Sequence, residues 1–207
     1  MIVAATGVAG TALLGASLAA EPGSPRFLRL TAATAATWVA GGLAAGPVPR
    51  GRRSVLVPVL TGAAAFGAFY AGALVARRIP VLNRALASVL RHAGGGPVAF
   101  ATLANGAAEE VFFRGALYAA LGGRRSTAIY MLVTAATRNP ALVLASGVMG
   151  ALFTLQRRAA GGIQAPVLTH VTWSALMLRY LPPLFAEAPE TNERSPSSSR
   201  STSESST

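Results

Sequence analysis

The sequence contains no cysteine, lysine or aspartate, and charged side chains make up only 12% of its 207 residues. An ordinary soluble domain carries roughly 25% charged residues, so this shortage, beside 52% hydrophobic residues, argues against a water-soluble globule. Without cysteine there is no thiolate nucleophile, thiolate metal site or disulfide. Without lysine there is no Walker-type phosphate loop, and without aspartate there is no Ser-His-Asp triad or aspartyl dyad.

The charges that remain are eighteen arginines and seven glutamates, for a net charge of +11. Most arginines flank hydrophobic runs, which indicates membrane topology and contact with anionic lipids. No basic patch interleaved with aromatic residues points to nucleic acid, so we expect membrane lipids and no nucleic acid among the partners. The bias toward Ala, Gly and Arg suggests a bacterial genome rich in G and C, and hence a bacterial cell membrane.

Long apolar runs recur along the chain, and about 20 apolar residues suffice for a helix to span a bilayer. The runs cover residues 2–20, 28–46, 55–76, 98–121, 126–137, 141–155 and 163–185. The first lacks the basic start of a signal peptide, so we expect a retained helix. Residues 79–92 place apolar residues at helical spacing with Arg84 and Arg91 on the other side, which predicts an interfacial amphipathic helix or a short connecting helix. We expect an all-α, polytopic transmembrane helical bundle with about seven spans, within a range of six to eight.

Two adjacent acids, Glu109 and Glu110, lie inside one of these apolar runs, where a charge costs about 2.5 to 3.5 kcal/mol. The other acids lie in a Pro/Gly turn or in the polar tail: Glu21, Glu187, Glu190, Glu193 and Glu204. Arg114 follows Glu110 at i+4, so its guanidinium can neutralise that carboxylate. Glu109 then has no local cation and can serve as a general base that takes a proton from water. The alternative is a structural ion pair that locks two helices together.

A second polar pair, His170 and Ser174, lies at i and i+4 on another apolar run. An intramembrane imidazole beside a hydroxyl can bind a metal, position water or stabilise an oxyanion. The alternative is a histidine that is only hydrogen-bonded. His92 follows an arginine and precedes three glycines, so we expect it to be a solvated loop residue.

Together the segments EEVFFRG (109–115) and APVLTHVTWS (165–174) resemble the CPBP family, the CAAX-protease and bacteriocin-processing intramembrane proteases that include the type II CAAX prenyl endopeptidase. The resemblance covers roughly residues 97–182. Members of that family carry EExxxR, FxxxH and HxxxN motifs on membrane helices. The resemblance implies that Glu109 activates the attacking water, that Glu110 and Arg114 support it, and that His170 belongs to a metal or oxyanion site.

The chain departs from the family pattern at two motifs. Ser174 stands where HxxxN has asparagine, which keeps a hydrogen-bond donor with a shorter reach. FxxxH has no counterpart: its spacing places it near residues 133–137, with Thr137 in the position of the histidine and Asn139 close by. Residues 153–157, from Phe153 to Arg157, offer a second placement, but it ends on an arginine.

A divalent metal such as zinc is one option at this site, although one histidine and two glutamates are few ligands for it. We favour metal-free activation of water by Glu109, with Thr137 or Asn139 holding the water. No other cofactor is expected. The residues that we assign to the site are Glu109, Glu110, Arg114, Thr137, Asn139, His170 and Ser174.

The domain organisation follows from these assignments. We expect N-terminal transmembrane helices and an amphipathic connector over 1–93, a CPBP-like catalytic core over 94–185, and a disordered Ser-rich tail over 186–207.

Excluding the other proteolytic chemistries favours a glutamate-based site. The HExxH motif of membrane zinc proteases and the GxSG serine motif are both absent. We therefore expect an integral membrane endopeptidase that hydrolyses a peptide bond of a membrane-associated protein or peptide. Two alternatives remain: a non-catalytic family member that acts as a membrane binding or scaffolding protein, and a small transporter with the glutamate pair as a proton relay.

Overall fold

The computed structural model describes residues 1–185, and within this range the chain is helical and contains no strand, which confirms the all-α class. The helices are α1 (Ile2–Leu18), α2 (Pro25–Ala44), α3 (Leu56–Ala76), α4 (Pro80–Leu90), α5 (Gly96–Glu110), a π-helix η1 (Val111–Leu117), α6 (Tyr118–Leu121), α7 (Gly123–Ala135), α8 (Pro140–Ala160), α9 (Gln164–Tyr180) and a 3-10 turn η2 (Pro182–Leu184). The tail expected over 186–207 lies outside the described residues.

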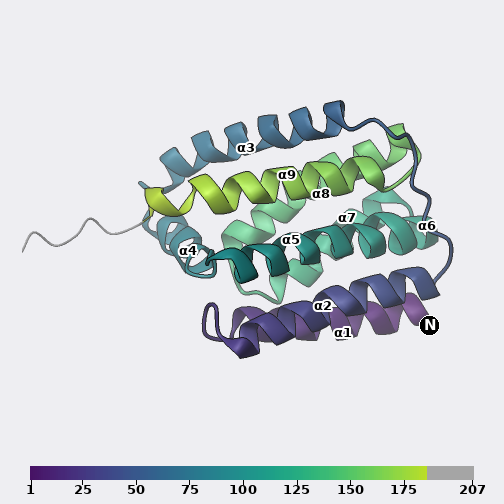
Figure 1. The fold of residues 1–207 in the computed structure, drawn as a ribbon, viewed down its shortest axis with the longest axis horizontal. Helices are drawn as coiled ribbons and strands as arrows, with labels where there is room; N and C mark the ends of the chain where they lie inside the picture. Colours follow the sequence, from purple (N-terminus) through teal and green to yellow (C-terminus); the bar gives the residue numbers. More distant parts are fainter. Residues whose placement is uncertain (186–207) are drawn as a thin grey trace, which may run out of the picture.

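Helix α5 lies in the middle of the bundle (Figure 1). Helices α1 and α2 pair along one side, and α3 and α9 pair along the other. Helix α5 packs against α2 and against α9, and α7 packs against α8. The helix that carries the glutamate pair is therefore covered on several sides by protein.

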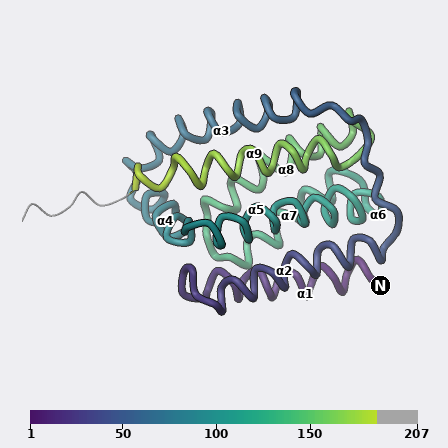
Figure 2. The backbone as a smooth tube through the Cα atoms, in the orientation of Figure 1, coloured from purple at the N-terminus to yellow at the C-terminus, as the bar shows by residue number. Residues whose placement is uncertain are grey.

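The connection between α2 and α3 runs along one end of the bundle (Figure 2). It is tied to the turn between α8 and α9 by backbone hydrogen bonds, including Arg52 N to Ala160 O (2.9 Å) and Gln164 N to Arg50 O (3.0 Å). Gly161 ends α8 with a φ of 74°, a left-handed conformation that suits glycine. These bonds fix the start of α9, the helix that carries His170.

Two of the described helices, α3 and α8, are long and apolar enough to cross a membrane. Helix α1 is apolar but has 17 residues. The expectation of about seven spans is not confirmed. It counted apolar residues between charges, and some helices that form there are shorter than the runs, such as α9 with 17 residues in the run 163–185.

The helices α7 and α8 are separated just before Pro140. Asn139 caps α8: its Oδ1 accepts hydrogen bonds from the backbone N–H groups of Ala141 (3.0 Å) and Leu142 (3.1 Å). Pro140 stands at the first position of α8, where its missing N–H costs nothing. The helix predicted over 79–92 is α4, while its position at a membrane interface stays a prediction.

Aromatic side chains of α2 and η1 form the main core of the described residues. Trp38 is fully buried and stacks on Phe112 at 5.0 Å between ring centroids, and Phe113 contacts both rings. A Cβ at Gly10 of α1 would overlap the Trp38 ring, so the glycine permits the close approach of α1 to α2. This core holds η1, and hence the residues after the glutamate pair, in place.

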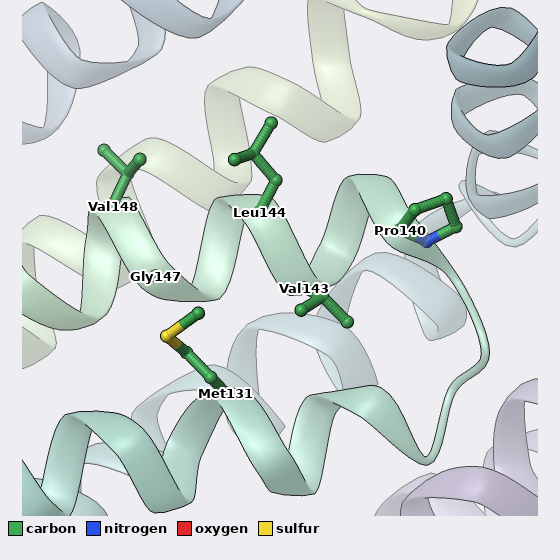
Figure 3. A pocket seen from close by; sticks show the side chains of 6 residues that line it. All are labelled: Met131, Pro140, Val143, Leu144, Gly147 and Val148. Carbon is green, nitrogen blue, oxygen red and sulfur yellow. The ribbon is translucent and has the colours of Figure 1, made fainter.

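A shallow pocket between α7 and α8 is purely apolar (Figure 3). Its lining residues are Met131, Pro140, Val143, Leu144, Gly147 and Val148. Leu144 and Val148 are exposed, and the lining includes no ionisable side chain. This pocket therefore offers no group for acid–base catalysis.

Candidate active site

The two glutamates are the last residues of α5, and the helix widens into η1 immediately after them. A π-helix leaves some backbone carbonyls without their usual α-helical partner. Here the Ser126 hydroxyl donates to the Phe113 carbonyl (2.5 Å), and Arg157 Nε donates to the Arg114 carbonyl (2.9 Å). Helices α7 and α8 thus stabilise the irregular segment, and such segments are frequent at functional sites.

Glu110 is fully buried and is bound by two basic side chains. Arg114, also fully buried, places Nη1 3.3 Å from Glu110 Oε1, so the expected i,i+4 ion pair is present. His170 from α9 places Nδ1 2.9 Å from the same oxygen. Because the carboxylate accepts, Nδ1 carries the hydrogen of this bond. The bond fixes the orientation of the imidazole and links α5 to α9.

Aromatic rings enclose the Arg114 guanidinium. Its Cζ lies 4.4 Å from the centroid of the Tyr130 ring and 5.0 Å from that of Phe153, distances typical of cation–π contacts. Phe153 also stacks on His170, with 4.8 Å between centroids. We call Glu110, Arg114 and the rings of Tyr130 and Phe153 the sealed cluster, since Glu110 and Arg114 have no exposed surface.

Glu109 has different neighbours. Asn105, one turn earlier on α5, donates from Nδ2 to Glu109 Oε1 (2.9 Å). Tyr130 from α7 donates its hydroxyl to Glu109 Oε2 (3.0 Å). Both carboxylate oxygens therefore have a neutral donor, and Glu109 makes no salt bridge within the described residues.

Glu109 faces a cavity of about 280 Å³, here called the site cavity. His170 and Ser174 from α9 and Thr137 after α7 line it as well. Apolar side chains from α1, α4 and α9 form much of the remaining wall, among them Leu14, Leu18, Leu86, Val89, Leu90, Met177 and Leu178. The cavity thus combines a largely apolar wall with one carboxylate, the imidazoles of His92 and His170, and hydroxyl groups, as a site for an apolar peptide would.

The structure brings together most, but not all, of the residues assigned from sequence. Glu109, His170, Ser174 and Thr137 share the site cavity, while Glu110 and Arg114 lie behind it in the sealed cluster.

Asn139 is not among the residues that line the site cavity. Its amide is occupied: Oδ1 caps α8, and Nδ2 donates to the Ala85 carbonyl (2.8 Å) and to Ser88 Oγ (3.0 Å) of α4. The structure does not support Asn139 as a holder of the water, because an asparagine before a proline-initiated helix is used as a cap.

His92 lies in the turn after α4, as expected of a loop residue, but it is not simply solvated. Its ring is half-buried, and its two nitrogens lie 3.3 Å from the carbonyl oxygens of Ser88 and Ala20. The ring also packs on Phe27 at 5.3 Å between centroids and lines the site cavity. This happens because α4 folds back over the cavity and carries the end of the helix onto the turn between α1 and α2.

Sequence reasoning missed Asn105 and Tyr130, the two donors to Glu109. Asn105 had a local signal, since it lies four residues before Glu109 and hence on the same helical face. Tyr130 had none, because its position depends on how α7 packs against η1.

Neighbouring ligands are too few here for a zinc site. Zinc is held by at least three protein ligands in catalytic sites. Among the described residues, no group of three or more His or Glu side chains is close enough to hold a metal. Beside the site cavity, Glu109 has donors on both oxygens, and His170 has only Nε2 left.

Comparison with known families agrees with this part of the molecule. Residues 96–176 match the family model described as type II CAAX prenyl endopeptidase Rce1-like. The matched segment begins with α5 and contains every residue of the candidate site, which confirms the resemblance noted from the two motifs. That family is a membrane-embedded protease family. No curated protein and no solved structure matches the chain.

Proposed function

We propose that the protein is an intramembrane endopeptidase that hydrolyses a peptide bond of a membrane-associated protein or peptide, with Glu109 as the base that activates water. The observation that carries this proposal is the convergence of Glu109, His170 and Ser174 on one cavity with a largely apolar wall. Helices that can cross a membrane and the match to a protease family support it at a coarser level.

The reaction would proceed by attack of water on the carbonyl carbon of the substrate. Glu109 takes one proton from the water as its oxygen forms the new bond, and later delivers that proton to the leaving amide nitrogen. Ser174, which lines the cavity, donates its hydroxyl to the developing oxyanion. His170 assists from the same face, held by Glu110 through Nδ1.

Glu110 and Arg114 support this chemistry from behind the cavity. Their charges cancel within the sealed cluster, so neither adds a net charge beside Glu109. Glu110 also orients the imidazole of His170, as carboxylates commonly do for active-site histidines.

The decisive experiment compares wild type with Glu109→Gln, both purified in detergent and incubated with a library of hydrophobic peptides read by mass spectrometry. General base catalysis contributes about 10²- to 10⁴-fold, so cleavage should fall by at least about 100-fold in Glu109→Gln. Glu21→Gln, in the turn between α1 and α2, is the matched control and should cleave as wild type does. A wild type that cleaves no peptide, or an active Glu109→Gln, contradicts the proposal.

A second candidate, a non-catalytic membrane binding or scaffolding protein, is favoured by one observation. Thr137 lines the site cavity in the position where the family motif has histidine, and a hydroxyl cannot accept and return a proton as imidazole does. In a scaffold, Glu109→Gln should leave partner binding intact, and neither wild type nor Thr137→His should cleave. Pull-down and cleavage assays on the same preparations separate the two functions.

For the surroundings of the protein we propose a bacterial cell membrane, with its lipids against the exposed apolar side chains of α3 and α8. Flotation of the full chain with liposomes tests this placement.

A further inference from the structure

The carboxylate of Glu109 is held at both ends by donors from two different helices. Asn105 Nδ2 on α5 lies 2.9 Å from Oε1, and the Tyr130 hydroxyl on α7 lies 3.0 Å from Oε2. All three side chains are at most 9% exposed. Each oxygen keeps one lone pair that no protein donor uses, so the plane of the carboxylate is fixed while it can still accept a proton.

Tyr130 connects the two glutamates. Its hydroxyl contacts Glu109, and the face of its ring lies 4.4 Å from the Arg114 guanidinium that neutralises Glu110. A cation over the ring draws electron density from it, which strengthens the phenol as a donor. Arg114 therefore affects Glu109 indirectly, because it strengthens the hydrogen bond that the neutral Tyr130 side chain donates to Glu109.

Asn105 has a further polar atom beside the site. Its Oδ1 is buried and has no hydrogen-bond partner, and the residue lines the site cavity. A buried amide oxygen normally accepts a hydrogen bond. Asn105, the adjacent Gly106 and His170 all line the site cavity, so the free oxygen belongs to a residue of the wall that also holds the imidazole.

We propose that Asn105 and Tyr130 hold Glu109 and the attacking water in position, in a site where Thr137 stands in place of the histidine of the family motif. Tyr130 is a positioning residue that fixes Glu109. Asn105 fixes Glu109 through Nδ2 and orients the attacking water through Oδ1. The water donates one hydrogen to Glu109 and the other to Asn105 Oδ1, which turns a lone pair of its oxygen toward the substrate carbonyl. On attack the first proton passes to Glu109 and the second stays on the oxygen. This inference rests on the proposed peptidase function.

The first test measures kinetics on Tyr130→Phe and Asn105→Leu, which keep the size of each side chain but remove its polar groups. Loss of a hydrogen bond to a charged group changes a rate or equilibrium constant by about 10- to 100-fold. We therefore expect kcat to fall by that factor in each variant. KM should stay within about twofold, because the lost interaction acts on the reacting water. Tyr180→Phe and Asn83→Leu, both at exposed positions, are the matched controls and should keep wild-type kcat.

The second test does not depend on cleavage. Glu109 is labelled in the full chain with a hydrophobic carbodiimide, and adduct formation is followed by mass spectrometry, with Glu109→Gln defining the background. Removing a donor should speed labelling several-fold in Tyr130→Phe and Asn105→Leu and leave the two controls unchanged. A merely structural role would change the melting temperature without this selectivity.

The outcomes separate the two proposals. Faster labelling with a wild type that cleaves nothing rejects the peptidase function and the water-orienting role but retains the positioning of Glu109. An active wild type with unchanged kcat in both variants overturns the present inference and leaves the peptidase intact. Equal labelling in variants and controls also overturns it.

Discussion

Two neighbouring glutamates of one helix sit in opposite surroundings. Glu110 points into the sealed cluster, where Arg114 and His170 bind one of its oxygens and no surface is exposed. Glu109 points to the site cavity, where neutral donors bind its two oxygens. The residue type, the helix and the apolar run are shared, so only the neighbours differ.

This contrast shows how two adjacent glutamates can both be accommodated in an apolar helix. A buried carboxylate needs a partner, and Glu110 has a cation beside it that cancels its charge. Glu109 has donors that orient it without neutralising it, so it remains free to exchange a proton. We infer that one glutamate serves stability and the orientation of His170, and the other serves chemistry. Three sets of variants test this division.

The largest effect is expected when the sealed cluster is broken. Glu110→Gln leaves the Arg114 cation buried without its counter-ion, which should cost about 3 to 5 kcal/mol of unfolding free energy and abolish activity through loss of the fold. The double variant Glu110→Gln with Arg114→Met removes both charges and should recover most of that stability. Thermal unfolding in detergent measures both. A Glu110→Gln protein as stable as wild type would contradict the role of the cluster.

A smaller effect is expected at Gly106, beside the imidazole. A Cβ there would lie 3.1 Å from His170 Nε2, so Gly106→Ala should displace the ring and reduce cleavage by about tenfold or more. Stability should change by less than about 1 kcal/mol, because the helix gain of alanine offsets the crowding. Gly72→Ala on α3, with open space around its Cβ, is the control. Equal activity of the two variants would show that the imidazole position does not matter.

The smallest effect on chemistry is expected at Asn139. Asn139→Ala removes the cap of α8 and the bonds to α4, at a cost of about 1 to 2 kcal/mol, with kcat unchanged because the residue does not line the site cavity. Asn139→Asp keeps the cap and loses only the donors to α4, so it should be the milder variant. Thermal unfolding and peptide cleavage on the same samples measure both. A loss of kcat without a loss of stability would return Asn139 to the active site.

The spacing of residues along the chain predicted the features that depend only on residues close together in the sequence. The i,i+4 relation of Glu110 and Arg114 is realised as an ion pair at 3.3 Å, and a helix, α4, forms within residues 79–92. The meeting of His170 with the glutamates could be expected only through the family resemblance. Nothing local indicated that Tyr130 would reach Glu109, or that His92 would fold onto Phe27. The expected number of spans is not confirmed, because apolar length limits a helix but does not set where it ends.

The sequence by itself determined the chemistry that is available. With no Cys, Asp or Lys and only two acids in apolar runs, any acid–base work at this site has to use glutamate and histidine. The spacing of Glu110 and Arg114 already set Glu109 apart as the glutamate without a local cation, and the tertiary structure decided what surrounds each of the two carboxylates. Adjacent positions on a helix point about 100° apart. The packing of α9 brings His170 to Glu110, whereas the packing of α7 brings the Tyr130 hydroxyl to Glu109, which faces the site cavity. Charge and reactivity of a buried group depend on such neighbours, which the chain order does not specify.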